Sequence, residues 1–125
     1  MEIEEAFMAA VAADFPSVPV SYPDVNFTPP GSGFWLEVSV LRNVEANQPL
    51  ANRPGIAQGV LQITVCGRSG GGILRFRPLL NQIRAAYRKG RAFASGHRIS
   101  DNPTELSPLV EGDKTMLPVS MSYSA

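Results

Sequence analysis

The segment FWLEVSVL, residues 34–41, decides the fold class, because its side chains alternate between two faces with a period of two residues. One face carries Phe34, Leu36, Val38 and Val40, and the other carries Trp35, Glu37, Ser39 and Leu41. This period is that of a half-buried β-strand. Residues 59–66 and 116–123 alternate in the same way, so the sequence predicts three long strands, each with an apolar face.

Apolar residues near the N-terminus recur instead with the spacing of a helix. The recurring positions are Ile3, Ala6, Phe7, Ala10 and Val11. Because Pro16 marks the end of this pattern, we expect a helix over residues 2–15. Glu2, Glu4 and Glu5 fall in its first turn, where exposed N–H groups favour negative charge.

A glycine turn at residues 67–72 leads into a second predicted helix, which continues to about residue 89. Its buried stripe is Phe76, Leu80, Ile83 and Tyr87, with Leu79 beside it. Pro78 is compatible only with the first turn of a helix, so the regular helix is expected to begin near residues 75–77.

Three arginines of this second helix form a row. Arg77, Arg84 and Arg88 are separated by seven and four residues. At about 100° per residue, this spacing places the three guanidinium groups in one strip beside the apolar face.

The other predicted elements are short or irregular. Residues 18–22 form a short strand that Pro19 confines to an edge of the sheet, and residues 92–100 form a hairpin. Residues 42–58 show neither period and contain two prolines, so we expect a long projecting loop or hairpin there. Residues 101–114 are interpreted as a connection.

These elements predict an α+β fold in a single domain over residues 1–125. Its sheet is largely antiparallel, and the two helices pack on one face of the sheet. Pro118 lies within the last strand and cannot donate a ladder hydrogen bond. The last strand is therefore expected either at an edge of the sheet or in an interrupted ladder.

Charge is unevenly distributed along a chain whose formal net charge is zero. Residues 1–45 carry seven acids and one base, residues 46–100 nine bases and no acid, and residues 101–125 four acids and one base, giving −6, +9 and −3. Surfaces of opposite sign would favour head-to-tail contact between identical copies, which closes into rings or continues as filaments. In the alternative, strands from the three segments interleave and the charges mix in space.

The sequence offers little for catalysis or metal binding. Cys66 is the single cysteine and His97 the single histidine, so an internal disulfide is excluded and zinc chemistry is close to excluded. The glycines of residues 67–72 fit neither the phosphate-loop nor the dinucleotide-binding pattern. We therefore expect no enzyme activity, no metal and no cofactor.

Membrane and secretion signals are not expected either. No apolar run approaches the length of about 20 residues that crosses a bilayer. The N-terminus, MEIEE, is acidic, whereas a secretory signal begins with positive charge. We expect synthesis in the cytosol and no membrane partner. A small nucleic-acid-binding module built on the basic segment is kept as an alternative, which predicts a steep dependence of DNA binding on salt.

Trp35 has two possible environments in this arrangement. If the helices cover the Phe34 face, Trp35 lies on the opposite face, where it is exposed or meets a partner. In the alternative, the 42–58 loop folds back over it. Trp35 and Arg53, a base within that loop, are therefore candidate interface residues.

Three stretches in this order resemble the tail terminator proteins of long-tailed bacteriophages, the minor-tail-protein-U-like group. They are FTPPGSGFWLEVSVL at 27–41, GVLQITVCGRSGGG with the following helix at 59–89, and LPVSMSYSA at 117–125. The arginine-rich helix with Pro78 near its start departs from the family pattern, which leaves the register of that helix open.

The resemblance implies a ring of six subunits at the head-proximal end of the tail tube, in the neck of a virion assembled in the bacterial cytoplasm. Such a ring stops tube polymerisation and joins the tail to the head connector or stopper protein, and DNA passes through its lumen. The alternative of similar size and assembly habit is another neck or head-completion component.

For such a ring we hypothesise that the arginine row of one subunit pairs with the acidic first turn of its neighbour. The bases are Arg77, Arg84 and Arg88, and the acids are Glu2, Glu4 and Glu5. We further predict that the 42–58 loop projects and becomes ordered on contact with the tube protein or a neighbour.

Overall fold

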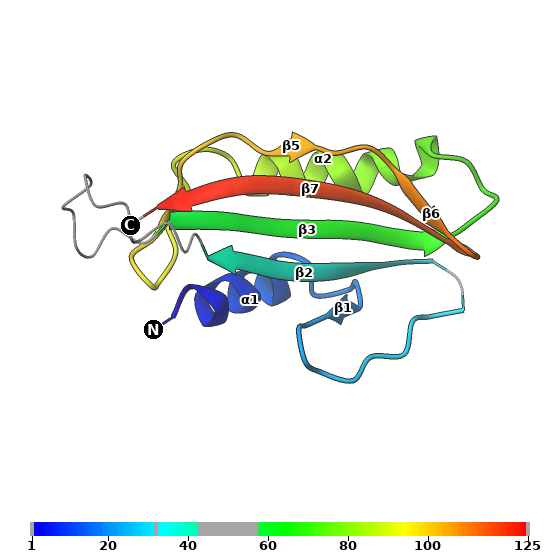
Figure 1. The fold of residues 1–125 in the computed structure, drawn as a ribbon, viewed down its shortest axis with the longest axis horizontal. Helices are drawn as coiled ribbons and strands as arrows, with labels where there is room; N and C mark the ends of the chain where they lie inside the picture. Colours follow the sequence, from blue (N-terminus) through cyan, green and yellow to red (C-terminus); the bar gives the residue numbers. More distant parts are fainter. Residues whose placement is uncertain (1, 32, 43–57, 125) are drawn as a thin grey trace.

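A sheet and two helices form two layers, as the computed structural model shows for residues 2–31, 33–42 and 58–124 (Figure 1). In chain order the elements are α1 (Ile3–Asp14), β1 (Val20–Ser21), β2 (Phe34–Arg42), β3 (Gln58–Arg68), the 3-10 helix η2 (Leu74–Phe76), α2 (Arg77–Ala86), β4 (Arg98–Ile99), β5 (Thr104–Glu105), β6 (Leu109–Glu111) and β7 (Lys114–Ser124). Most of the predicted 42–58 loop lies outside the described residues.

The sheet has the spatial order β1-β2-β3-β7-β4, and β5 and β6 also pair with β7. Among the strands that the structure describes, only β1 runs parallel to its neighbour, and all other pairs are antiparallel. The predicted α+β class with a largely antiparallel sheet is therefore confirmed. The short strand at residues 20–21 lies at one margin of this sheet, where Pro19 was expected to confine it.

One hydrophobic core lies between the sheet and both helices, which confirms that the helices pack on one face. The strand residues in it belong to the faces predicted as apolar, and Leu36 of β2 lies beside Val65 of β3, which lies beside Leu117 of β7. α1 contributes Ile3, Ala6, Phe7 and Val11, and α2 contributes Leu79, Leu80 and Ile83. Tyr87, just beyond α2, is fully buried and has its ring centroid 6.0 Å from that of Phe7. This tyrosine joins the two helices.

Pro118 lies in the interior of the sheet, so its expected edge position is wrong and the interrupted ladder is confirmed. Leu106 donates its backbone N–H to the Pro118 carbonyl at 2.9 Å, and the two β5 residues pair with Val119 and Ser120. In an antiparallel pair, the N–H and C=O of one residue point to the same side. The missing N–H of Pro118 therefore faces residue 106 rather than β3, and strand pairing stops there.

Residues 101–114 contain two short strands where a connection was expected. β5 and β6 lie along β7 and, with β4, complete its outer side in three separate pieces. A segment of two or three residues is too short to show a period of two, so pairing with β7 rather than residue pattern defines these strands.

Candidate functional site

The basic row of α2 is held by one carboxylate from β5. Arg77 and Arg84 donate from their Nη1 atoms to the same oxygen of Glu105, at 2.7 and 2.9 Å. The hydrogen bond from Arg77, followed by its charge and the contacts of Arg84, lowers the pKa of Glu105 below its ordinary value. Arg77 and Arg84 of the predicted strip thus lie together and face β5. The predicted continuation of the helix to about residue 89 is wrong, because α2 ends at Ala86 and Arg88 lies beyond it.

Arg88 extends this row but has no ion-pair partner among the described residues. It lines a shallow cavity of about 370 Å³ between α2 and the connection that precedes β5. The cavity is lined by Asn81, Arg84, Ala85, Arg88, Asn102 and Pro103. Guanidinium and amide donors in one concave surface are suited to a carboxylate from outside the chain. We call α2 and β5, with this groove, the α2 flank.

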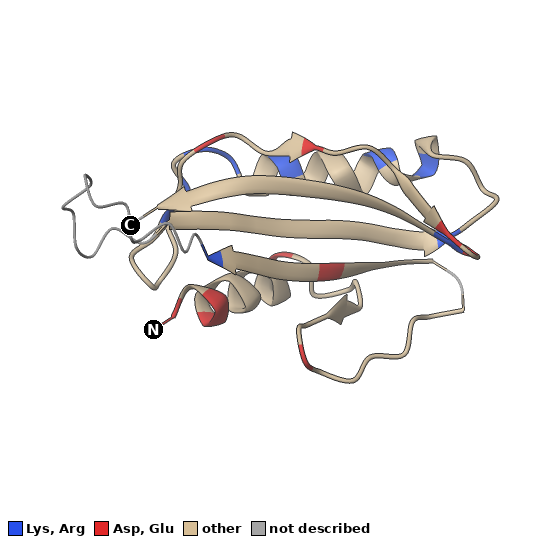
Figure 2. Cartoon of the chain, in the orientation of Figure 1, with Lys and Arg blue, Asp and Glu red and all other residues tan. Residues whose placement is uncertain are grey.

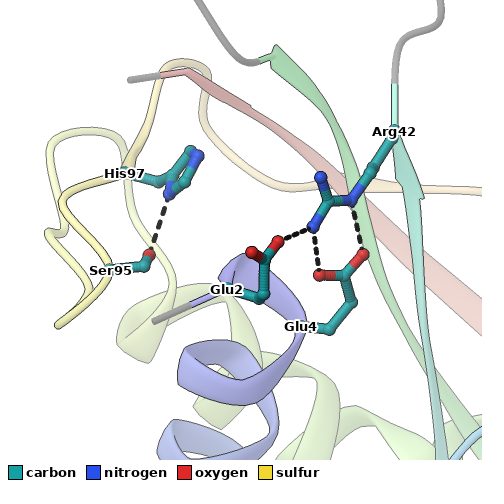
Figure 3. A network of polar contacts seen from close by, with 5 residues as sticks. All are labelled: Glu2, Glu4, Arg42, Ser95 and His97. Atoms are coloured by element: carbon teal, nitrogen blue, oxygen red, sulfur yellow. Dashed lines mark hydrogen bonds and ion pairs between the residues drawn. The ribbon is translucent and has the colours of Figure 1, made fainter.

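Acidic residues of α1 gather around a single arginine at the other side of the domain. Arg42, the last residue of β2, donates from Nε and Nη2 to the two oxygens of Glu4, both at 2.7 Å, and also contacts Glu2 (Figure 3). The hydrogen bonds from Arg42 lower the pKa of Glu4 to about 2. Glu5 is exposed and, within the part of the chain that the structure describes, has no ion-pair partner. We call α1 and the end of β2 the α1 flank.

The predicted pairing partners are therefore already engaged within one chain. Glu2 and Glu4 contact Arg42, and two of the three arginines contact Glu105. Other pairs also join distant segments, such as Arg91 with Asp14 at 2.7 Å. Charges from the three segments therefore mix in space at these pairs, as the alternative expected, and Figure 2 shows basic and acidic positions on neighbouring elements.

A residual segregation remains on the two flanks. On the α2 flank, three arginines face one glutamate, which leaves a side-chain charge of +2 (three less one). On the α1 flank, Glu2, Glu4 and Glu5 near the first turn of α1 face Arg42, which leaves −2 (one less three); Asp14 at the other end of α1 is neutralised by Arg91. Figure 1 shows α1 along β2 and α2 along β5, on the same face of the sheet but near its opposite margins.

Trp35 is fully buried, so the alternative in which it is exposed is wrong. Its indole Nε1 donates to Glu37 at 3.3 Å, and the guanidinium of Arg68 lies 5.4 Å from the ring. Arg68 also donates to the Pro30 carbonyl at 3.0 Å, which ties the chain preceding β2 to this place. Arg53, the other candidate beyond the two flanks, lies outside the described residues.

An exposed apolar edge is the feature that sequence reasoning missed. Leu106, Leu109 and Val110 are 43%, 54% and 67% exposed, and all three lie in the connection or strand beside β7. A signal was present in the sequence, since ELSPLVE at 105–111 places three large apolar residues within five positions between two glutamates.

Groups suited to chemistry are few among the described residues. No three His, Cys, Asp or Glu side chains in residues 2–31, 33–42 and 58–124 lie close enough together to hold a metal ion. Burial raises the pKa of the Cys66 thiol to about 12, so it remains protonated near neutral pH. None of the described helices has the length and apolar character needed to cross a membrane.

Comparisons with known proteins agree with this architecture. A family model described as phage tail terminator protein matches residues 2–123. One solved structure is similar with a TM-score of 0.73 and 20% identity, over 97% of this chain and 88% of the other, which shows the fold alone. A comparison with curated proteins found no match. The family resemblance carried by residues 27–41, 59–89 and 117–125 is therefore confirmed.

Proposed function

This chain belongs to the phage tail terminator protein family, and from that premise we propose that it forms a closed ring at the head-proximal end of the tail tube. Membership implies a structural protein of the virion tail that contacts the tail tube. In our proposal the ring contains six subunits, stops tube polymerisation and joins the tail to the head connector.

The opposite charges of the two flanks are the observation that carries the ring. Each subunit has a surface of +2 at one side of its sheet and a surface of −2 at the other. Two different surfaces that complement each other make a heterologous contact, in which each copy offers one surface to each neighbour. Such contacts close into a ring when the rotation between copies allows it.

We propose that Arg77, Arg84 and Arg88 of one subunit face the acidic first turn of α1 in the next. Arg88 and Glu5 can meet without breaking any ion pair of the described residues, whereas the others must share or exchange partners. Exposed pairs contribute about 0.2–1 kcal/mol each, so they fix the register of the ring more than its affinity.

The test is a tube elongation assay with purified tail tube protein. Addition of this protein should stop growth at one end of the tube, and electron microscopy should show a single ring there. Tubes that elongate at the same rate with a bound ring would favour the neck or head-completion alternative. Binding to duplex DNA with a steep salt dependence, and no effect on tubes, would favour the nucleic-acid alternative.

A further inference from the structure

The edge formed by β5, β6 and the residues between them exposes several large apolar side chains. Every residue from 106 to 111 is exposed, and three of these six are large and apolar. The side chains of Leu106, Leu109 and Val110 together form what we call the apolar edge. Exposed apolar side chains that cluster on a surface mark sites of contact with another molecule.

The strand pairing leaves one side of this edge open. Leu109, Val110 and Glu111 pair with Met116, Thr115 and Lys114 of β7. Within the described residues, β5 and β6 pair with no strand other than β7. Soluble proteins usually protect such margins with charge, proline or a covering segment. Here Pro108 and Glu111 give partial protection, whereas the apolar side chains between them remain exposed.

The apolar edge is continuous with the α2 flank. Glu105, which holds Arg77 and Arg84, directly precedes Leu106. Asn102 and Pro103, which line the groove beside Arg88, directly precede β5. A partner that extends from the groove past Glu105 would therefore also meet Leu106, the first residue of the apolar edge.

We infer that a second copy of this chain covers the apolar edge, through the side of its sheet that carries α1 and β1. This inference rests on the proposed ring. The β1 margin of the sheet lies beside the α1 flank, whose negative charge complements the positive α2 flank. This margin also carries an exposed apolar residue, Val25, which is 58% exposed and next to Tyr22. Apolar contact along the edge then supplies the affinity that exposed ion pairs do not supply.

Thiol protection tests this contact directly. Val110→Cys places a reactive thiol on the apolar edge, and Ile73→Cys places one at another exposed apolar site, 47% exposed, in the turn before η2 and outside both flanks. The native Cys66 is fully buried and does not compete for the reagent. The rate of modification is measured for dilute monomer and for assembled protein, alone and on tube ends, with the oligomeric state followed by sedimentation.

The inference expects modification of the Val110→Cys thiol to slow by at least about tenfold on assembly, because a covered site reacts only when the contact opens. The Ile73→Cys thiol should keep its rate. If rings form and both thiols react as fast as in the monomer, or both slow equally, the inference is overturned while the proposed function stands. If the unmodified protein neither assembles nor stops tube growth, the proposed function fails and the inference fails with it.

A second variant gives an independent readout. Val110→Thr keeps a β-branched side chain and replaces a methyl group with a hydroxyl, so the strand is retained. It should weaken assembly about as much at high salt as at low salt, because apolar contact is not screened by salt. Unchanged assembly of this variant at both salt concentrations would also overturn the inference.

Discussion

The α1 flank and the α2 flank show the same arrangement of charge with the signs exchanged. On one flank a single arginine from the sheet, Arg42, contacts two glutamates, Glu4 of α1 and Glu2 just before it. On the other flank a single glutamate from the sheet, Glu105, contacts two arginines of α2. Glu5 of α1 and Arg88, two residues beyond the end of α2, carry further charges outside these pairs. Folding therefore neutralises each flank in part and leaves complementary surfaces.

The flanks differ in what lies beside the charge. The α2 flank continues into an exposed apolar edge, whereas the α1 flank adjoins the short strand β1. Charge pairs at an exposed surface give register and encounter rate, and buried apolar area gives affinity. The α2 flank, with the apolar edge, therefore combines charges that fix register with apolar area that gives affinity. The charges alone do not explain a stable ring.

The largest expected effect comes from Tyr87, the buried side chain that packs between the two helices. Tyr87→Ala removes a fully buried ring that contacts Phe7 of α1 and lies stacked on Phe15, with centroids 6.4 Å apart. Loss of a buried aromatic ring costs about 3–5 kcal/mol. Chemical denaturation should show a decrease of this size in the free energy of unfolding. The half-buried Tyr22→Ala is the control, and an equal loss there would contradict a special role for Tyr87.

Acid should weaken the α1 flank in a defined range of pH. The pKa of Glu4 is about 2 in the folded chain against an ordinary value of 4.5. A lowered folded pKa contributes stability that is fully present above about pH 4.5 and is lost as the pH falls toward about 2. We expect the melting temperature of the wild type to fall more steeply over this range than that of Glu4→Gln. The control Glu5→Gln should keep the wild-type slope, and equal slopes for all three proteins would contradict the role of Arg42.

Removal of Arg42 or Glu105, each of which contacts two opposite charges, should weaken folding and strengthen assembly. Arg42→Gln frees Glu2 and Glu4, and Glu105→Gln frees Arg77 and Arg84. Each change should lower the free energy of unfolding only modestly, since the pairs lie at the surface and solvent screens them. Each should also strengthen assembly at low salt, because the freed charges become available to a neighbour. Sedimentation at two salt concentrations measures this, and weaker assembly of both variants would contradict the exchange of partners.

The long elements could be predicted because their pattern is dictated locally. Each side chain of β2 meets either the core or the other face of the sheet, and the alternation from Phe34 onward records this. The ends were less well predicted: the strands continue as far as Arg68 and Lys114, which pair with each other. Backbone hydrogen bonds extend a ladder whatever the side chains are, so hydrophobic pattern does not mark the last residues.

The charged rows could also be predicted, but their partners could not. Arg77 and Arg84 lie on one strip of a helix because of their spacing alone. Their partner Glu105 is 28 and 21 residues away and reaches them only because β5 lies along β7. Arg42 and Glu4 are likewise 38 residues apart. Such contacts depend on tertiary packing, which the periodicity of a sequence does not contain.

The most direct test of the head-to-tail ring exchanges one charge on each flank. Arg88→Glu and Glu5→Lys each place like charges across the proposed contact, and exposed pairs of this kind are worth about 0.2–1 kcal/mol. Lys89→Glu, one residue away and outside the groove, is the matched control for the change in net charge. The measurement is sedimentation velocity at low salt, alone and with tail tubes. We expect each single variant to weaken ring assembly and the double variant Arg88→Glu, Glu5→Lys to restore it. A double variant whose loss equals the sum of the two single losses would contradict the account.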